Sequence, residues 1–451
     1  MKIVIIGMGK IGRNILHNLS DENHTITIID EDNDKVQNLI ERYDVFGVVG
    51  NGACMDIQEE AGVNTADLVI ALTNSDELNI LSCLVAKKLN AHNTVARVRN
   101  PHYRKQILAM KDELGISMIL NPEKETANEI FNLINLPSVA QIDSFARGRV
   151  NLVAIVVEKG CLLIGETLIS VGRKFRTRVL ICAVQRKGKV YIPSGNFVIE
   201  EGDKIHFTSD AKSLGDFLAE INLVESPLKN VMIVGSGNIG YYLADDLSKK
   251  KYKVKLIEKN KARAEEMAKA LPKVTVVYGD GTKHDLLLEE GLESIDAFVT
   301  LIGIDEENII LGMHATKQHI RKIITKIDRD ELINMLDEVG IHNNVTPKDI
   351  VATRVLRYIR ALSNKRGSNI ITLYRLVNNQ VEALEFIAKG QEYIFDKPLR
   401  ELKLKENCLI ACIMRNNEVI IPDGNTCIKQ YDNVIVVTTH KNFDDLTDVF
   451  A

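Results

Sequence analysis

The sequence predicts an α/β protein with two Rossmann-type, doubly wound parallel-sheet domains, each followed by a small α+β module. Three observations support this fold class: an internal repeat that spans the chain, an alternation of apolar strands with amphipathic helices, and a glycine fingerprint in each copy. The 451 residues allow two to four domains. A 45% hydrophobic and 26% charged composition is typical of globular proteins.

The repeat divides the chain into two halves of similar length. Residues 1–20 align without gaps with a segment that ends at Ser248, and residues 190–205 align with residues 419–434. The first alignment pairs three glycines with three others: Gly7 with Gly235, Gly9 with Gly237 and Gly12 with Gly240. A repeat of this length indicates that a whole unit of folding is duplicated.

The first part of each half has the rhythm of a parallel sheet covered by helices. Short β-branched apolar runs alternate with stretches of helical periodicity. In the first copy the expected strands are residues 2–7, 25–30, 46–50, 67–72 and 93–98. The second part of each half is richer in short strands and turns, which favours a small α+β module.

These patterns give four expected domains. The two Rossmann-type domains cover residues 1–135 and 229–362, and the two smaller modules cover residues 146–227 and 369–451. Junctions are expected near Pro137, at Gly367-Ser368 and at Ser226-Pro227.

The first glycine fingerprint follows a strand directly and opens a helix, which is the context in which the motif carries meaning. Gly7 permits a tight turn, Gly9 lets a pyrophosphate approach the backbone, and Gly12 lets the helix pack closely on the strand. A phosphate would then lie at the helix N-terminus, held by free N–H groups and the helix dipole. The loop residues expected to contact it are Gly7, Met8, Gly9, Lys10, Ile11 and Gly12.

Asp30 ends the second expected strand, where a carboxylate can accept hydrogen bonds from ribose hydroxyls. An acidic residue at this position disfavours a 2′-phosphate, so NAD(H) or an adenine nucleotide is expected rather than NADP. The alternative is a degenerate domain that keeps its glycines only for backbone geometry. This alternative is more tenable for the second half, where Glu258 replaces Asp30 and Asp280 replaces Asn51.

Further candidate contacts follow other strand ends, where open parallel sheets place their ligands. Asn51 could contact the adenosine end, and Thr73 and Asn74 could line the central crevice, although either loop could be a simple turn. Arg97 and Arg99 lie on one face at a strand end, where a guanidinium could bind a phosphate in a bidentate manner, although an arginine at a strand end is often part of a surface ion pair. The second half offers the matching candidates Gly235, Gly237, Asn238, Ile239, Gly240, Glu258, Asp280 and Lys326.

Several classes of protein find no support in the sequence. The net charge of −4 gives no reason to expect binding to nucleic acid, and no run of about 18 apolar residues could span a membrane. Cys408 and Cys412 lack further ligands at metal spacing and are expected in the core, so no metal site is predicted. No catalytic constellation or Walker motif occurs, so we expect a ligand-binding regulator and no enzyme.

The order of these motifs resembles the RCK family, regulators of potassium conductance that are also called KTN proteins. The resemblance rests on GMGKIG, Asp30, GNGA, ALTNSDELNI, ARVR and a strand-rich module with IPSG and EEGD. The duplication in one chain without a membrane part is similar to the regulatory subunits of Trk-type potassium uptake transporters. The resemblance covers essentially the whole chain.

The resemblance implies a cytoplasmic protein that assembles into a homo-oligomeric ring, dimeric or tetrameric, on the inner face of the cell membrane. Its partner would be a membrane potassium transporter of the Trk type, which it would gate in response to NAD(H) or ATP/ADP. Carried over to this sequence, the nucleotide would contact Gly7 to Ile11 at its phosphates, Asp30 at the ribose, Thr73 and Asn74 in the crevice, and Arg97 at a phosphate. Two alternatives stay open: an NAD-dependent oxidoreductase, and an RCK-type sensor of another transporter or channel.

Overall fold

The computed structural model divides into two compact units, residues 1–134 with 228–359 and residues 135–227 with 360–451. It describes residues 1–20, 24–135, 140–145, 150–157, 159–210, 213–223, 228–336, 339–341, 343–364, 370–376, 380–390, 392–416, 418–440, 443 and 445–450. The predicted junctions at Pro137, Gly367-Ser368 and Ser226-Pro227 lie outside these residues. The first unit holds the two Rossmann-type sheets and the second holds the two smaller modules.

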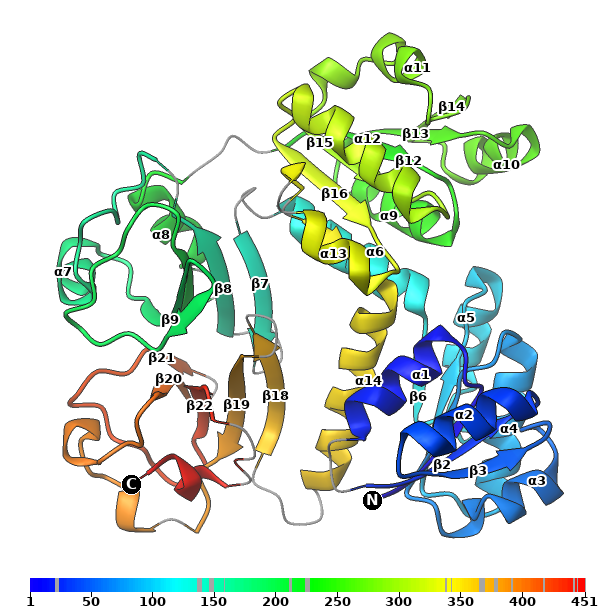
Figure 1. The fold of residues 1–451 in the computed structure, drawn as a ribbon, viewed down its shortest axis with the longest axis horizontal. Coiled ribbons are helices and arrows are strands. Elements are labelled where there is room, and N and C mark those ends of the chain that lie inside the picture. Colours follow the sequence, from blue (N-terminus) through cyan, green and yellow to red (C-terminus); the bar gives the residue numbers. More distant parts are fainter. Residues whose placement is uncertain are drawn as a thin grey trace. The chain divides into compact units, whose positions relative to one another are not determined.

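The first half builds a six-stranded parallel sheet in the order β3-β2-β1-β4-β5-β6 (Figure 1). Its strands are β1 (Lys2–Ile6), β2 (Thr25–Asp30), β3 (Phe46–Val49), β4 (Leu68–Ala71), β5 (Asn93–Arg97) and β6 (Met118–Leu120). Its helices are α1 (Lys10–Leu19), α2 (Asn33–Arg42), α3 (Met55–Glu60), α4 (Asp76–Lys88), α5 (Pro101–Ala109) and α6 (Pro122–Asn135). The strand order reverses direction between β1 and β4, which is where open α/β sheets bind ligands.

The second half repeats this architecture in the order β14-β13-β12-β15-β16-β17. Its strands are β12 (Asn230–Val234), β13 (Lys253–Glu258), β14 (Thr275–Tyr278), β15 (Ala297–Thr300), β16 (Lys322–Lys326) and β17 (Asn344–Val345). Its helices are α9 (Asn238–Lys249), α10 (Lys261–Ala270), α11 (His284–Glu289), α12 (Asp305–Lys317), α13 (Asp330–Leu336) and α14 (Pro347–Asn364). The five predicted strands of the first copy are confirmed, and β6 is an additional strand.

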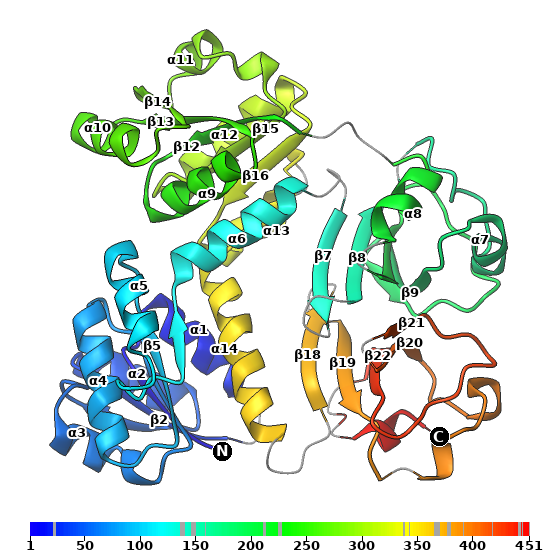
Figure 2. The ribbon, with the colours of Figure 1, turned by 180° about the vertical axis from the view of Figure 1, so that it is seen from behind.

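The last helix of each Rossmann half contacts the other half. Helix α6 runs beside the second half (Figure 2). Its Ala127, Ile130 and Ile134 are buried in one cluster with residues of β12, α9 and β13. In return, Tyr358 of α14 donates a hydrogen bond to Asn93 of the first half at 3.4 Å. The two halves of this unit therefore share apolar core and exchange helices.

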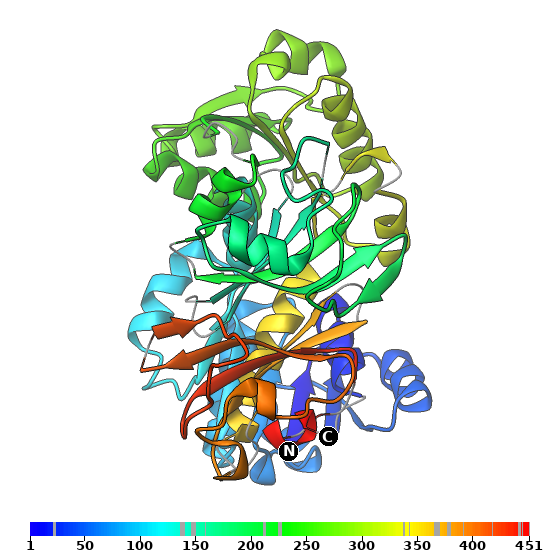
Figure 3. The same cartoon turned by 90° about the vertical axis from the view of Figure 1, so that its left-hand side faces the viewer.

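The second unit contains two five-stranded antiparallel sheets with the same topology, β10-β9-β11-β8-β7 and β18-β19-β22-β20-β21 (Figure 3). The first module comprises β7 (Ala140–Phe145), β8 (Val150–Val156), α7 (Leu168–Lys174), β9 (Leu180–Arg186), β10 (Lys189–Tyr191), β11 (Lys204–Asp210) and α8 (Leu214–Glu220). The second comprises β18 (Ile370–Leu376), β19 (Val381–Ile387), β20 (Cys408–Arg415), β21 (Glu418–Ile420), β22 (Asn433–Thr438) and 3-10 turns at Glu392–Ile394, Leu399–Glu401 and Leu446–Val449.

An apolar cluster joins the two modules, with Leu152 and Cys182 of the first packed among Ala411 and Cys412 of the second. The Thr208 hydroxyl donates a hydrogen bond to the Ala411 carbonyl across this cluster at 2.7 Å. Burial raises the pKa of the Cys412 thiol to about 12, so this thiol is a neutral packing group. The core role predicted for Cys412 and its neighbour Cys408 is confirmed.

Candidate nucleotide site

Two glycines of the first fingerprint are required by the fold itself. Gly7 has φ +92°, and a Cβ atom there would lie 2.8 Å from the backbone nitrogen of Thr73. A Cβ atom on Gly12 would lie 2.3 Å from the carbonyl oxygen of Gly7. The tight turn and the close packing of helix on strand therefore need glycine whether or not a ligand binds.

Gly9 has a different status, because neither its backbone nor its packing requires glycine. Its φ is −71°, and a Cβ atom there would meet no described atom within 4 Å. Gly9 is the N-cap of α1, where no side chain caps the helix and the first turn holds no acidic residue in the described structure. The loop thus leaves open space in front of a helix N-terminus with free N–H groups, which suits an anion.

The Asp30 carboxylate lies directly beside this loop. Its Oδ2 accepts a hydrogen bond from the backbone N–H of Met8 at 2.7 Å, and its Oδ1 accepts one from the backbone N–H of Asp32 at 3.1 Å. The ammonium of Lys35 stands 3.7 Å from Oδ1. Because a carboxylate oxygen has two acceptor positions, Oδ2 retains one for a ligand hydroxyl.

Glu258 takes the place of Asp30 in the second half, but its surroundings differ. Its Oε2 accepts hydrogen bonds from both the hydroxyl of Ser236, at 2.6 Å, and the backbone N–H of Ser236, at 3.1 Å. Its Oε1 accepts one from the backbone N–H of Asn260 at 2.7 Å. Burial alone would raise the pKa of Glu258, but these hydrogen bonds outweigh it and the pKa is lowered.

Asn51 and Asp280 stabilise the turns that follow β3 and β14. The Asn51 side-chain oxygen accepts from the backbone N–H of Ala53 at 2.9 Å, and Asp280 accepts from the N–H and the hydroxyl of Thr282. The hydroxyl of Thr282 is the main cause of a lowered pKa at Asp280. These oxygens form local Asx turns, so a role in binding stays a prediction.

Thr73 lies against Gly7 at the end of β4, and Asn79 fixes its position. The buried Asn79 side chain accepts from the N–H and the hydroxyl of Thr73 and donates to the carbonyls of Thr73 and Arg97. It therefore ties the ends of β4 and β5 together. Asn308 makes the same bridge in the second half, from the backbone of Ile302 to the carbonyl of Lys326.

Asp76 fixes the neighbouring loop in a similar manner. Its Oδ2 accepts from the backbone N–H groups of Arg99 and Asn100 at 2.9 and 2.8 Å, and Asp305 repeats the arrangement in the second half. Asn74 contributes its carbonyl, which accepts from the Arg99 guanidinium. Sequence reasoning missed the framework residues Asp76 and Asn79, although both copies repeat the pattern DExN, as DELN at residues 76–79 and DEEN at residues 305–308.

Arg97 is half-buried at the end of β5, close to the crevice. Burial lowers its pKa, with Arg99 as a second cause, and burial raises the pKa of the nearby Glu123. The Nε of Arg97 is buried and has no hydrogen-bond partner among the described residues. A buried, unpaired guanidinium N–H is costly, so this atom fits an anionic ligand better than a purely structural role.

Lys326 occupies the matching place in the second half, where it is already paired. Its ammonium lies 3.3 Å from Asp328, which stands where the first half has Arg99. The same carboxylate oxygen also lies 3.6 Å from the ammonium of Lys10, in the first glycine loop. The single negative charge of Asp328 is therefore shared between the ammonium groups of Lys326 and Lys10.

A cleft of about 1180 Å³ is lined by residues of both halves. Asn74, Arg99 and Tyr103 line one wall, and Asn238 and Arg263 line the other. Of the predicted residues, the structure thus brings Gly7 to Gly12, Asp30, Thr73 and Arg97 together at one edge of the sheet, while Asn74 and Asn238 face the cleft.

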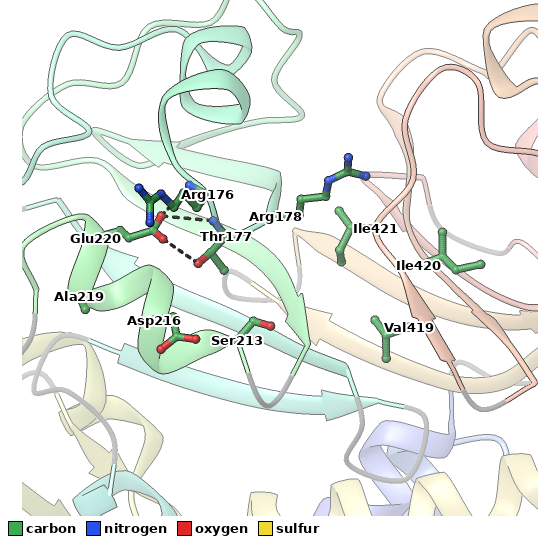
Figure 4. A pocket seen from close by; sticks show the side chains of 10 residues that line it. All are labelled: Arg176, Thr177, Arg178, Ser213, Asp216, Ala219, Glu220, Val419, Ile420 and Ile421. Carbon is green, nitrogen blue, oxygen red and sulfur yellow. Dashed lines mark hydrogen bonds between the residues drawn. The ribbon is translucent and has the colours of Figure 1, made fainter.

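A separate pocket of about 820 Å³ lies in the second unit (Figure 4). It is lined by Arg176 and Arg178 together with the acidic Asp216 and Glu220. Glu220 accepts hydrogen bonds from the hydroxyl and backbone N–H of Thr177, so both of its carboxylate oxygens already have partners within the module. None of the predicted site residues lies there.

Comparison with known proteins matches both parts of each half to family models. The TrkA-N domain model matches residues 3–122 and 231–347, and the TrkA-C domain model matches residues 152–222 and 387–451. A Trk system potassium uptake protein TrkA from Vibrio alginolyticus is 32% identical over 459 residues, covering 100% of this chain and 98% of the relative. The chain belongs to the TrkA family. A TrkA homolog from Archaeoglobus fulgidus is 29% identical, and the alignment covers 100% of this chain and 100% of the homolog.

Solved structures support the same fold for this TrkA family member. A GsuK channel bound to NAD has a TM-score of 0.62 at 20% identity, covering 97% of this chain and 76% of the channel. A GsuK structure bound to ADP has a TM-score of 0.51 at 16% identity, covering 81% and 69%. The duplicated α/β architecture is therefore shared with these proteins.

Membership of the TrkA family makes this chain a component of potassium uptake and not a metabolic enzyme. The oxidoreductase alternative loses its basis, because relatives that match the whole chain are potassium uptake proteins. Within the part of the chain that the structure describes, no helix has the length and apolar character needed to cross a bilayer.

Proposed function

We propose that this chain regulates a Trk-type potassium transporter by binding NAD(H) or an adenine nucleotide in its first Rossmann half. The proposal depends on one observation, the open space around Gly9. The fold gives no reason for glycine at that position, whereas a diphosphate approaching the N-terminus of α1 needs the space that a side chain would fill.

Two further residues fit the two ends of such a ligand. Asp30 offers a free acceptor position beside the glycine loop for a ribose hydroxyl. Arg97 offers a buried N–H, without a described partner, for a phosphate oxygen. Binding would replace unfavourable burial of an unpaired polar group with a charge-assisted hydrogen bond.

The ligand would act by stabilising one arrangement of the two halves. The cleft that begins at Asn74 is bounded on its other side by Arg263 of the second half. A nucleotide reaching into the cleft would contact both halves. It can shift the equilibrium between two arrangements of the halves only by its difference in affinity for those arrangements.

The remaining predictions complete the proposal. We place the chain at the cytoplasmic face of the membrane as a homo-oligomeric ring, attached through a Trk-type transporter. The division into residues 1–135, 146–227, 229–362 and 369–451 stays a prediction, as does the choice between NAD(H) and ATP/ADP.

The first test is Asp30→Ala, measured by calorimetric titration with NADH and with ADP. The variant loses a charged acceptor for the ribose, so we expect affinity to fall by about 1.5–3 kcal/mol, or roughly tenfold to 150-fold. Asp34→Ala is a matched control, because Asp34 is an exposed carboxylate in the first turn of α2. Equal affinity of both variants and the wild type would contradict the assignment of Asp30.

The second test is potassium uptake by vesicles that contain a Trk-type transporter and this protein. Uptake should respond to nucleotide with the wild type and lose that response with Asp30→Ala. Co-purification with a different membrane channel and not with the Trk-type transporter would favour the alternative of another RCK-type sensor.

A further inference from the structure

The carboxylates of the two halves differ in the number of acceptor positions that the protein itself uses. At Asp30, Oδ2 receives one hydrogen bond, from the backbone N–H of Met8. At Glu258, Oε2 receives two, because Ser236 donates both its backbone N–H and its hydroxyl. A ribose presents two neighbouring hydroxyls. The Asp30 carboxylate keeps two of its four acceptor positions free for them, whereas the Glu258 carboxylate keeps only one.

The residue responsible is Ser236, which stands where the first half has Met8. Its side chain is fully buried, and its hydroxyl lies 2.6 Å from Glu258 Oε2. Met8 has no hydroxyl, so Asp30 cannot be satisfied in this manner. Arg263 holds the Ser236 loop in place by donating to the Ser236 carbonyl at 3.3 Å.

We propose that Ser236 determines the nucleotide stoichiometry of the chain. Its hydroxyl takes the hydrogen-bonding position of a ribose hydroxyl on Glu258 and thereby closes the second half to nucleotides. The chain then binds one nucleotide, in the first half. This inference rests on the proposed function of the first half.

An independent observation agrees with a closed second half. Lys326 is paired with Asp328 at 3.3 Å, whereas the matching Arg97 has a buried Nε without a described partner. A phosphate entering the second half would meet the negative charge of Asp328 as well as the positive charge of Lys326. Asp328 therefore offsets part of the attraction that Lys326 would exert on that phosphate.

The phosphate-binding geometry of the second half is nevertheless intact. Gly237 has φ −57°, and a Cβ atom there would meet no described atom within 4 Å, as at Gly9. Gly237 is also an N-cap without a side-chain hydrogen bond in the described structure of α9. Removing the Ser236 hydroxyl should therefore restore the missing acceptor without rebuilding the loop.

The test is Ser236→Ala in the full-length chain, with calorimetric titration by NADH and by ADP to give the number of sites. We expect one nucleotide per wild-type chain and a second, weaker site in Ser236→Ala. Affinity at the second site should rise by about tenfold or more, as expected for one charged hydrogen bond. The double variant Ser236→Ala with Glu258→Ala should return to one site.

Ser294→Ala is the matched control, because its hydroxyl donates to the Gly291 carbonyl at 2.9 Å, in a 3-10 turn of the same half away from the loop. Two nucleotides per wild-type chain, or one per Ser236→Ala chain, would overturn the inference. Failure of the proposed function looks different: the wild type would then bind no nucleotide at all. Thermal unfolding of each variant confirms that the fold is retained.

Discussion

The two Rossmann halves are alike where residues hold the fold and different at the proposed nucleotide site. Asn79 and Asn308 make the same bridges between strand ends, with a 3.0 Å bond to the carbonyl of the next strand in both copies. In contrast, Asp30 and Glu258 have different free acceptor positions. A duplicated framework can therefore keep its geometry while the hydrogen bonding around one side chain changes.

The largest effect on stability should come from the shared framework. Asn79→Ala leaves the N–H and carbonyl of Thr73 and the carbonyl of Arg97 without their partner, so we expect a loss of about 3–5 kcal/mol in the free energy of unfolding. Asn308→Ala should lower the free energy of unfolding by a similar amount. Asn38→Ala should lower it little, because Asn38 is an exposed residue of α2. A large difference between Asn79→Ala and Asn308→Ala in denaturant titrations would break the comparison.

The next largest effect should separate the two glycine loops. Gly9→Val places a branched side chain where the diphosphate must lie, so nucleotide affinity should fall by about a hundredfold or more. Gly237→Val should leave the measured affinity unchanged, because the second half is proposed to be closed. Neither residue has positive φ or a described neighbour within 4 Å of its Cβ position, so both variants should keep the fold. Because valine is a poorer N-cap than glycine, both should lose a small and similar amount of stability.

The smallest effect should distinguish the two arginines near β5. Arg97→Ala removes one charge-assisted contact to a phosphate, and affinity should fall by about tenfold in the same titrations. Arg99→Ala removes a partly exposed ion pair with Asp76, so it should lower stability by about 1 kcal/mol or less. Its effect on affinity should stay within about threefold. The reverse pattern would assign the ligand contact to Arg99.

Local patterns were sufficient to predict five strands of the first Rossmann sheet, but not the three-residue strand β6. The strand that ends at Asp30 and the glycine loop at Gly7 are set by adjacent residues, because β-branched runs and positive φ leave few alternatives. The duplication made the second half predictable from the first. The family comparison confirms the fold and the potassium uptake component predicted from the resemblance.

Contacts between distant segments could not be predicted. The hydroxyl of Ser236 donates a hydrogen bond to Glu258, 22 positions away in the sequence, and only the folded loop reveals this contact. Likewise, the pairing of Lys326 with Asp328 depends on side-chain direction after β16. The buried Nε of Arg97 is a property of packing, and no sequence pattern reports it.

The exchanged helices set a limit on how this protein could be divided. A chain ending at residue 227 would keep α6, whose Ala127, Ile130 and Ile134 are buried against the second half, and would lose α14 with Tyr358. Those apolar side chains would then face water. Two such truncated chains could cover each other's α6, so we expect a half-length product to be an obligate homodimer and the full chain to be its covalently linked form.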